Sequence, residues 1–171
     1  MARPTPVPVR DARAGDLDRI LELNNAALPA VGELDTGALE QLVGWAHSVL
    51  VVDAADRAGG VAAFLLGLTG RGLAYDSPNY AAFSTRHERF AYVDRVVVDP
   101  AHQAGGLGTA CYDAFVARAR ADAYPVLCAE VNTVPRNDVS LRFHDRYGFS
   151  PVGEQVTEGG AKRVVLLELP L

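Results

Sequence analysis

Three glycines, Gly105, Gly106 and Gly108, separate an apolar run that ends at Pro100 from a helical pattern over 106–123. Glycine has no Cβ atom and readily adopts positive φ, so backbone at these positions can approach a ligand closely. The first amides of a helix have no partner within the helix, and the helix dipole makes that end positive. A strand, a glycine-rich loop and a helix in this order can therefore bind phosphate. A plain turn without a ligand would use the same residues, and the glycines alone do not decide between the two.

The spacing of these glycines disfavours two well-known phosphate-binding loops. No Lys-Ser or Lys-Thr pair follows them, as a P-loop would require. The segment GLGTAC (106–111) lacks the third glycine of the dinucleotide-binding fingerprint. We therefore disfavour a nucleotide-phosphate binder.

Length and composition indicate one globular domain. The chain has 171 residues, of which 49% are hydrophobic, and we expect a single domain over 1–171 with its core at about 7–169. The formal net charge of -5 argues against nucleic acid and mildly favours a cationic partner. Cys111 and Cys128 lack metal-ligand spacing, so we expect no metal, no disulfide and a reducing cytoplasm. We see no signal-peptide core or membrane span.

Periodicity and capping residues predict the elements that carry the loop. Asp16, Thr36 and Asn137 are expected to cap helices, and Gly148 to end the last one. We expect helices at 17–28, 37–48, 106–123 and 137–147, and strands at 7–13, 48–54, 60–68, 90–100, 126–132 and in two closing segments after 148. This order predicts an α/β (α+β) protein with a mixed sheet of about seven strands and about four helices.

The segment 75–95 is rich in aromatic residues and joins two predicted strands. A connection this long inside a compact domain is usually functional. Ser77 followed by Pro78 signals the start of a short helix at about 78–88.

Two motifs resemble those of the GCN5-related N-acetyltransferase (GNAT) family. VVVDPAHQAGGLGTA is similar to its acetyl-CoA motif, Arg/Gln-x-x-Gly-x-Gly/Ala after a strand with Val-x-Pro, and here the motif reads QAGGLG (103–108). NDVSLRFHDRYGF (137–149) resembles the Asn-x-x-Ala-x-x-Leu-Tyr-x-Arg/Lys-x-Gly-Phe helix of the same family. The predicted element order also matches, so the resemblance covers about 7–169. The combination of YDSPNY, YVDR, CAEVN and SLRFHDRYGF resembles a bacterial subgroup of predicted acetyltransferases, which implies no particular acceptor.

The resemblance implies that acetyl-CoA is the cosubstrate and that no metal takes part. The strands at 90–98 and 126–132 should splay, and the pantetheine arm should pair with backbone in the gap, where the Val96 amide would polarise the thioester carbonyl. The glycine loop should hold the pyrophosphate. The cofactor-binding residues implied in this way are Val96, Val97, Val98, Gln103, Ala104, Gly105, Gly106, Gly108, Thr109, Asn132, Asn137, Ser140 and Arg146.

The resemblance also implies catalytic positions. Family members place a base at positions that match Tyr92 and Asp94, and we take Asp94 as the base and Tyr92 as its neighbour on the same strand face. A structural role, in which Asp94 pairs with Arg95, Arg163 or a loop amide, is the equally weighted alternative. The tyrosine that serves the family as general acid is replaced by His144, which could donate a proton, orient the sulfur or simply fill the space. Arg95 is expected to pair with Glu130.

The acceptor is expected to contact Asp76, Asn79 and Tyr80, unless the aromatic rings of this segment simply cover the core. We predict an N-acetyltransferase that transfers acetyl directly to a small-molecule amine or to a peptide or protein amine. The alternative is a non-catalytic acyl-CoA-binding module of the same fold. We expect a cytoplasmic protein with neither nucleic acid nor membrane as a partner, and a homodimer is among the candidate oligomeric states.

Overall fold

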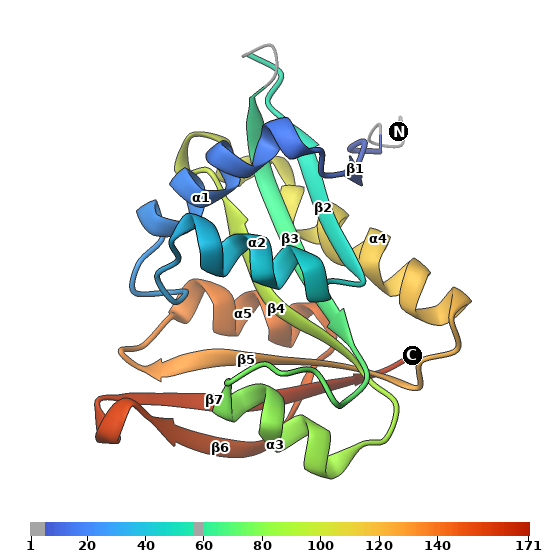
Figure 1. The fold of residues 1–171 in the computed structure, drawn as a ribbon, viewed down its shortest axis with the longest axis vertical. Coiled ribbons are helices and arrows are strands. Elements are labelled where there is room, and N and C mark those ends of the chain that lie inside the picture. Colours follow the sequence, from blue (N-terminus) through green and yellow to red (C-terminus); the bar gives the residue numbers. More distant parts are fainter. Residues whose placement is uncertain (1–5, 57–59) are drawn as a thin grey trace. The chain divides into compact units, whose positions relative to one another are not determined.

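The structure is a computed structural model that describes residues 6–56 and 60–171 (Figure 1). Its α-helices are α1 (Leu17–Ala26), α2 (Thr36–Trp45), α3 (Pro78–Arg86), α4 (Leu107–Ala121) and α5 (Asp138–Tyr147). Its strands are β1 (Arg10–Asp11), β2 (Ser48–Asp53), β3 (Val61–Thr69), β4 (Ala91–Val98), β5 (Val126–Val134), β6 (Ser150–Thr157) and β7 (Lys162–Pro170). Short 3-10 helices occur at Ala14–Asp16, Pro100–Gly105 and Glu158–Gly160.

The strands form one mixed sheet in the order β1-β2-β3-β4-β5-β7-β6. The pairs β1–β2, β2–β3, β5–β7 and β6–β7 are antiparallel, whereas β4 and β5 run parallel. The predicted mixed seven-stranded α/β fold is therefore confirmed. The short helix expected from Ser77-Pro78 is α3, which adds a fifth helix to the four main ones. Within the described residues, no helix has the length and apolar character needed to cross a membrane.

The chain divides into two compact units. Unit 1 comprises the described residues up to Gly67 together with Asp94–Ala117, and unit 2 comprises Leu68–Val93 and Arg118–Leu171. The boundary cuts β4 between Val93 and Asp94, so the predicted splay of β4 from β5 stays a prediction, as does the single domain.

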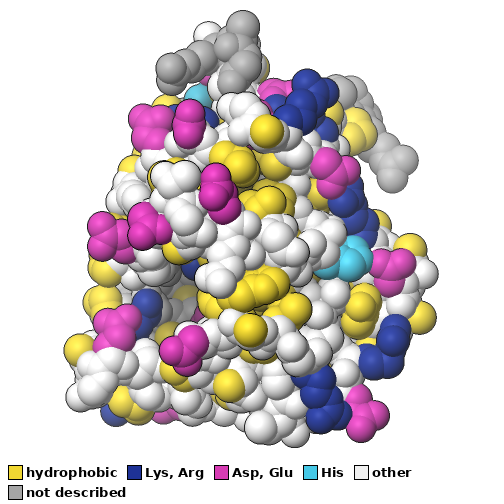
Figure 2. Space-filling model, in the orientation of Figure 1, with side chains coloured by type: hydrophobic (Ala, Val, Ile, Leu, Met, Phe, Trp, Pro, Cys, Tyr) yellow, Lys and Arg dark blue, Asp and Glu magenta, His cyan; other side chains and the backbone are white. Residues whose placement is uncertain are grey.

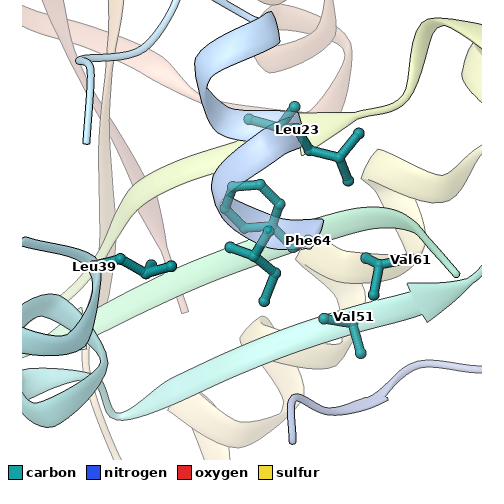
Figure 3. Packing of buried hydrophobic residues seen from close by; sticks show 7 residues of the cluster. Leu23, Leu39, Val51, Val61 and Phe64 are labelled. Atoms are coloured by element: carbon teal, nitrogen blue, oxygen red, sulfur yellow. The ribbon is translucent and has the colours of Figure 1, made fainter. Parts of the chain in front are cut away.

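Unit 1 has a core between the helices α1 and α2 and its strands. Figure 3 shows Leu23 of α1, Leu39 of α2 and Phe64 of β3 gathered in this core. The fully or almost fully buried members of the cluster are Ile20, Leu23, Leu39, Val51, Val61, Phe64 and Val97. Because side chains alternate along a strand, Val97 is held on the face of β4 that α1 and α2 cover.

Within unit 1, helix α4 packs on β3 at Gly67. A Cβ atom built at Gly67 would lie 2.3 Å from Cζ of Phe115 on α4. Phe115 is fully buried, so its ring has no room to retreat. Glycine is required here because the aromatic ring of α4 lies directly on the strand backbone.

In unit 2, α3 lies in front of β7 and β6 in the view of Figure 1. Ser77 caps α3 by accepting a hydrogen bond from the Tyr80 amide, and Pro78 occupies its first turn. The rings of Tyr80 and Phe83 on α3 lie 6.0 and 5.8 Å from the ring of Tyr92 on β4. Apolar contact with aromatic rings therefore holds α3 against the sheet.

Several local predictions need correction. The first strand covers only Arg10–Asp11 rather than 7–13, because only these two residues pair with β2. Asp35, not Thr36, caps α2 and accepts from the amide of Ala38 at 2.7 Å. The side chain of Asp16 makes no cap hydrogen bond to α1 but pairs with Arg10 at 2.7 Å. Asn137 and Gly148 act as predicted, since Asn137 accepts from the Ser140 amide and Gly148 has φ 107°.

Candidate active site

The glycine loop of unit 1 is more regular than the sequence suggested. Pro100–Gly105 form a 3-10 helix, which Asp99 caps by accepting from the amide of Ala101 at 3.0 Å. Gly106 then adopts φ 68° and ψ 17°, the left-handed conformation that glycine accommodates best. Helix α4 begins at Leu107, one residue later than expected. The loop thus delivers the chain directly from β4 to the N-terminus of a 15-residue helix.

The residues of this loop are open to a ligand. A Cβ atom at Gly106 would meet nothing within 4 Å. Gln103, Gly105, Gly106 and Thr109 are exposed, and Gly108 is partly exposed in the first turn of α4. Ala104 belongs to the 3-10 helix, and its side chain lies outside the described residues. An anion here would meet backbone amides and the positive end of the α4 dipole.

The part of β4 that is predicted to bind pantetheine directly precedes this loop in the sequence and belongs to unit 1. The side chain of Val97 is committed to the core, whereas Val96 and Val98 are partly exposed on the other face of β4. The structure therefore leaves the backbone roles of these three valines as predictions.

Asp94 forms a buried ion pair with its neighbour in unit 1. Its Oδ2 accepts from Nε of Arg95 at 2.7 Å, and both side chains are almost fully buried. Nη1 of Arg95 also donates to Oδ1 of Asn24 at 2.8 Å and to the carbonyl of Gly32 at 3.1 Å. The pairing of Asp94 with an arginine is the alternative that the sequence left open. It does not exclude a role as base, which stays a prediction.

Tyr92, the other predicted residue on this strand, belongs to a different set of contacts in unit 2. Its hydroxyl donates to Oε1 of Glu130 at 2.9 Å, and Nδ2 of Asn79 donates to the same oxygen at 3.1 Å. Glu130 is thus held by β4 and α3. The described contacts of Arg95 are with Asp94, Asn24 and Gly32, and its expected pairing with Glu130 stays a prediction. This cluster links a predicted catalytic residue with a predicted acceptor residue.

The two other predicted acceptor residues differ in environment. Asp76 is exposed. Tyr80 is 3% exposed, and its hydroxyl donates to the carbonyl of Gly70 at 3.0 Å while accepting from the amide of Leu73. Tyr80 therefore fastens the segment before α3, and its contact with an acceptor stays a prediction.

His144 on α5 is buried in unit 2 between aromatic rings. Its Nδ1 lies 2.8 Å from the carbonyl of Ser140, which can only accept, so Nδ1 carries a proton that it donates there. The rings of Phe143 and Phe149 meet it edge-on at 5.2 and 5.1 Å. Burial lowers the pKa of His144, and the hydrogen bond to Ser140 only partly opposes this. In the neutral ring Nε2 is a proton acceptor, so a general-acid role would require the imidazolium form.

The remaining predicted cofactor residues lie around α5. Asn137 and Ser140 are partly exposed in its first turn, and Arg146 is exposed in its last turn. Asn132 of β5 is buried, and its carbonyl accepts from the amide of Asn137 at 3.0 Å. Their contacts with acetyl-CoA stay predictions.

A further cluster was not expected from the sequence. His87, Cys128 and Glu168 each offer a potential metal ligand atom within 4.8 Å of the others. However, Glu168 is already bound by Nε2 of His87 at 2.8 Å and by Nε of Arg86 at 2.9 Å. Burial raises the pKa of Cys128, which disfavours the thiolate that a metal needs. Burial would also raise the pKa of Glu168, but the two hydrogen bonds outweigh it and lower that pKa. The contacts describe an ion pair that fastens the end of α3 to β7.

Three solved structures with the same fold are distant in sequence. The ribosomal-protein-S18-alanine N-acetyltransferase from Escherichia coli is 16% identical, with a TM-score of 0.70 over 95% of this chain and 92% of that one. Ard1 from Thermoplasma volcanium is 20% identical, with a TM-score of 0.76 over 96% and 97%. The yncA protein of Salmonella typhimurium, solved with its cofactor acetyl-CoA, is 23% identical, with a TM-score of 0.68 over 96% and 93%.

At these identities the likeness establishes the fold alone. No curated protein matches the sequence closely enough to count as a relative. The sequence of residues 17–149, however, matches the family described as the acetyltransferase (GNAT) family. The predicted resemblance is confirmed, because the match includes both motifs and most of the chain. This protein belongs to the acetyltransferase (GNAT) family.

Proposed function

We propose that this protein transfers the acetyl group of acetyl-CoA directly to an amine. The observation that carries the proposal is the junction of unit 1, where β4, a left-handed Gly106 and the N-terminus of α4 follow one another with open space at the glycine. This backbone fits a pyrophosphate, which needs amide donors and positive potential and excludes Cβ atoms. The fold is shared with a protein solved with acetyl-CoA.

The residues proposed to hold acetyl-CoA remain those implied by the motifs. In unit 1 they are Val96, Val97, Val98, Gln103, Ala104, Gly105, Gly106, Gly108 and Thr109, and in unit 2 they are Asn132, Asn137, Ser140 and Arg146. Acetyl-CoA supplies an acetyl thioester, which an uncharged amine can attack. The protein must hold the thioester, take a proton from the amine and allow the thiolate to leave. We propose Asp94 as the base, with Tyr92 beside it on β4, and His144 as the group nearest the leaving sulfur.

The surface charge agrees with a cationic acceptor. Figure 2 shows acidic side chains dispersed over unit 1 around α1 and α2. The exposed acidic residues on or between these helices are Asp18, Glu22, Glu33, Asp35 and Glu40. Together with the net charge of -5, they favour approach of an ammonium group, whether on a small molecule or on a peptide or protein. A cytoplasmic location is part of this proposal, because both cysteines are free thiols.

The alternative is a module that binds acyl-CoA without catalysis. One observation favours it: the only ring proton of neutral His144 is donated to Ser140 and cannot reach a thiolate. Release of free thiol from acetyl-CoA in a broad panel of amines would exclude this alternative. Acetyl-CoA binding without thiol release from any amine would support it and contradict the proposed transfer.

A matched pair of substitutions tests the binding site. Gly106→Asn and Gly106→Asp have the same size, and both residues tolerate the left-handed conformation. Only Asp adds a negative charge beside the expected pyrophosphate. We expect calorimetry to show acetyl-CoA binding at least about tenfold weaker in Gly106→Asp than in Gly106→Asn, since close like charges repel by more than about 1 kcal/mol. Equal affinity of the two variants would contradict the site.

A further inference from the structure

His102 lies in the 3-10 helix of the glycine loop and contacts a carboxylate from another part of unit 1. Its Nε2 lies 3.1 Å from Oδ1 of Asp56, which is located between β2 and β3. An ionised carboxylate can only accept a hydrogen bond, so Nε2 carries a proton and donates it there. The backbone amide of His102 donates to the carbonyl of Asp99 at 2.8 Å. Both the ring and the backbone of His102 are therefore held in place.

The other ring nitrogen of His102 is not satisfied in the same way. Nδ1 is buried and has no hydrogen-bond partner among the residues that the structure describes. With the proton on Nε2, Nδ1 of the neutral ring is an acceptor, yet it lies 3.8 Å from a second acceptor, Oδ2 of Asp99. A buried acceptor that faces a carboxylate costs free energy. If Nδ1 also binds a proton, this contact becomes an attraction between imidazolium and carboxylate.

Asp99 connects His102 with the beginning of the glycine loop. Its Oδ1 accepts from the amide of Ala101 and so caps the 3-10 helix, while its Oδ2 accepts from Nη2 of Arg19 on α1. The amide of Asp99 donates to the carbonyl of Ala62 on β3 at 2.8 Å. Asp99 thus attaches the loop to both α1 and β3, and the ring of His102 lies beside this attachment.

The charged groups described around the ring come from three parts of the chain. Asp56 lies between β2 and β3, Asp99 precedes the 3-10 helix, and Arg19 belongs to α1, where it also pairs with Glu22 at 2.8 Å. The two carboxylates lie beside the two ring nitrogens, whereas Arg19 contacts Asp99. A proton on Nδ1 would therefore give the ring an anionic partner on each side. It would also add a positive charge within the loop that is expected to bind the pyrophosphate.

We propose that His102 is a positioning residue of the glycine loop and that proton binding at its Nδ1 strengthens the binding of acetyl-CoA. This inference rests on the proposed acetyl-CoA site, whose dependence on pH it specifies. The imidazolium can contact Asp56 and Asp99 at once, which reduces the motion that the ligand would otherwise have to restrict. It also places a positive charge shortly before the N-terminus of α4, where an anion is stabilised. By linkage, binding of the ligand then favours the protonated ring.

The probe for the test is 3′-dephospho-coenzyme A, which keeps the pyrophosphate but lacks the 3′-phosphate. A phosphate monoester has its second pKa near 6, so acetyl-CoA itself would change charge in the pH range of interest. The affinity of the protein for the probe is measured by calorimetry at constant ionic strength from about pH 5.5 to 8, the range in which histidine ordinarily titrates.

Two substitutions fix the charge at position 102, and a third removes its partner. His102→Gln stays neutral and can still donate to Asp56, whereas His102→Lys stays positive throughout this pH range. Asp99→Asn removes the carboxylate that faces Nδ1 but keeps an acceptor oxygen for the amide of Ala101. Thermal melting of each variant verifies that it is folded.

His47→Gln is the matched control. His47 also belongs to unit 1, and its described side-chain contacts are with Ser48 and the ring of Phe115, which lie outside the glycine loop. The substitution removes a titratable ring of the same kind, so it separates the effect of His102 from that of any other histidine in this unit.

The affinity of the parent for the probe should fall by about two- to fivefold as the pH rises across this range, the effect of one charge near a helix N-terminus. His102→Gln should bind at every pH like the parent at high pH, and His102→Lys like the parent at low pH. Asp99→Asn should lose most of the pH dependence, and His47→Gln should keep it. The inference is overturned if the parent shows no such dependence, if folded His102→Gln or Asp99→Asn retains it in full, or if His47→Gln abolishes it.

The outcomes also separate this inference from the function on which it rests. If the folded parent binds acetyl-CoA but not the probe, or binds the probe equally at every pH, the inference is overturned and acetyl-CoA binding stands. If the parent binds neither compound, the proposed site and the inference both fail. Thiol release from acetyl-CoA in the panel of amines tests the transfer separately. If the expected pH dependence is found but no amine releases thiol, acetyl transfer fails while the role of His102 stands.

Discussion

Asp94→Asn separates the two roles that the structure leaves for Asp94. The substitution keeps the shape of the side chain and an acceptor oxygen for Nε of Arg95, but it removes the negative charge. Arg95 is 8% exposed, and its other described contacts, with Asn24 and Gly32, are with uncharged oxygens. Removing one partner of a buried ion pair costs about 3–5 kcal/mol. Because the amide retains part of the hydrogen bond, we expect the free energy of unfolding to fall by about 2–4 kcal/mol.

Urea denaturation followed by circular dichroism measures this change. Glu40→Gln is the matched control, since it also converts a carboxylate to an amide in unit 1 but at an exposed site, where we expect a change below about 0.5 kcal/mol. Acetyl transfer is then measured at a temperature where Asp94→Asn remains folded. If Asp94 is the base, its replacement should lower kcat by about 10²–10⁴-fold. If Asp94 is only a structural partner of Arg95, kcat should stay nearly unchanged. An unfolding free energy within about 0.5 kcal/mol of the parent would refute the account of the ion pair.

Two further predictions concern packing and pH. Gly67→Ala should destabilise the protein by about 1–3 kcal/mol, because its Cβ would lie 2.3 Å from the ring of Phe115, and adding Phe115→Leu should recover part of that loss in urea melts. Because the pKa of His144 is lowered in the folded protein, the unfolded chain binds a proton at this residue first as the pH falls. The contribution of neutral His144 to the free energy of unfolding is therefore complete above the unfolded pKa of about 6.5. It is lost as the pH falls through the folded pKa. In His144→Phe this part of the pH dependence should vanish, and urea midpoints that decline with acid as steeply as in the parent would contradict the assignment.

Local signals in the sequence predicted most of the fold. Ser77-Pro78 placed the start of α3, and Asn137 and Gly148 bounded α5, because each acts on backbone groups within a few residues of itself. The glycine loop was recognised for the same reason. The first strand was predicted too long because its length depends on a partner far along the chain, and β2 pairs only with Arg10–Asp11.

The side-chain contacts of the candidate site could not be predicted in the same way. Glu130 meets Tyr92 and Asn79, which lie 38 and 51 residues away, and no spacing in the sequence brings these three together. The register of β4 on β5, which pairs Tyr92 with Cys128, is what sets their meeting. Adjacent strand residues normally point to opposite faces, so the Asp94–Arg95 pair was also only one of several options.

The partners of the two carboxylates imply different chemistry for each. Asp94 is bound by the guanidinium of Arg95, so the pair carries no net charge and offers little attraction to an ammonium group. The described contacts of Glu130 are with a phenol and an amide, which fix the position of the carboxylate. If Asp94 is the base, its pairing with Arg95 must loosen when the acceptor binds, so Arg95→Lys, which loses the forked geometry, should alter kcat, and an unchanged kcat in the folded variant would contradict that role.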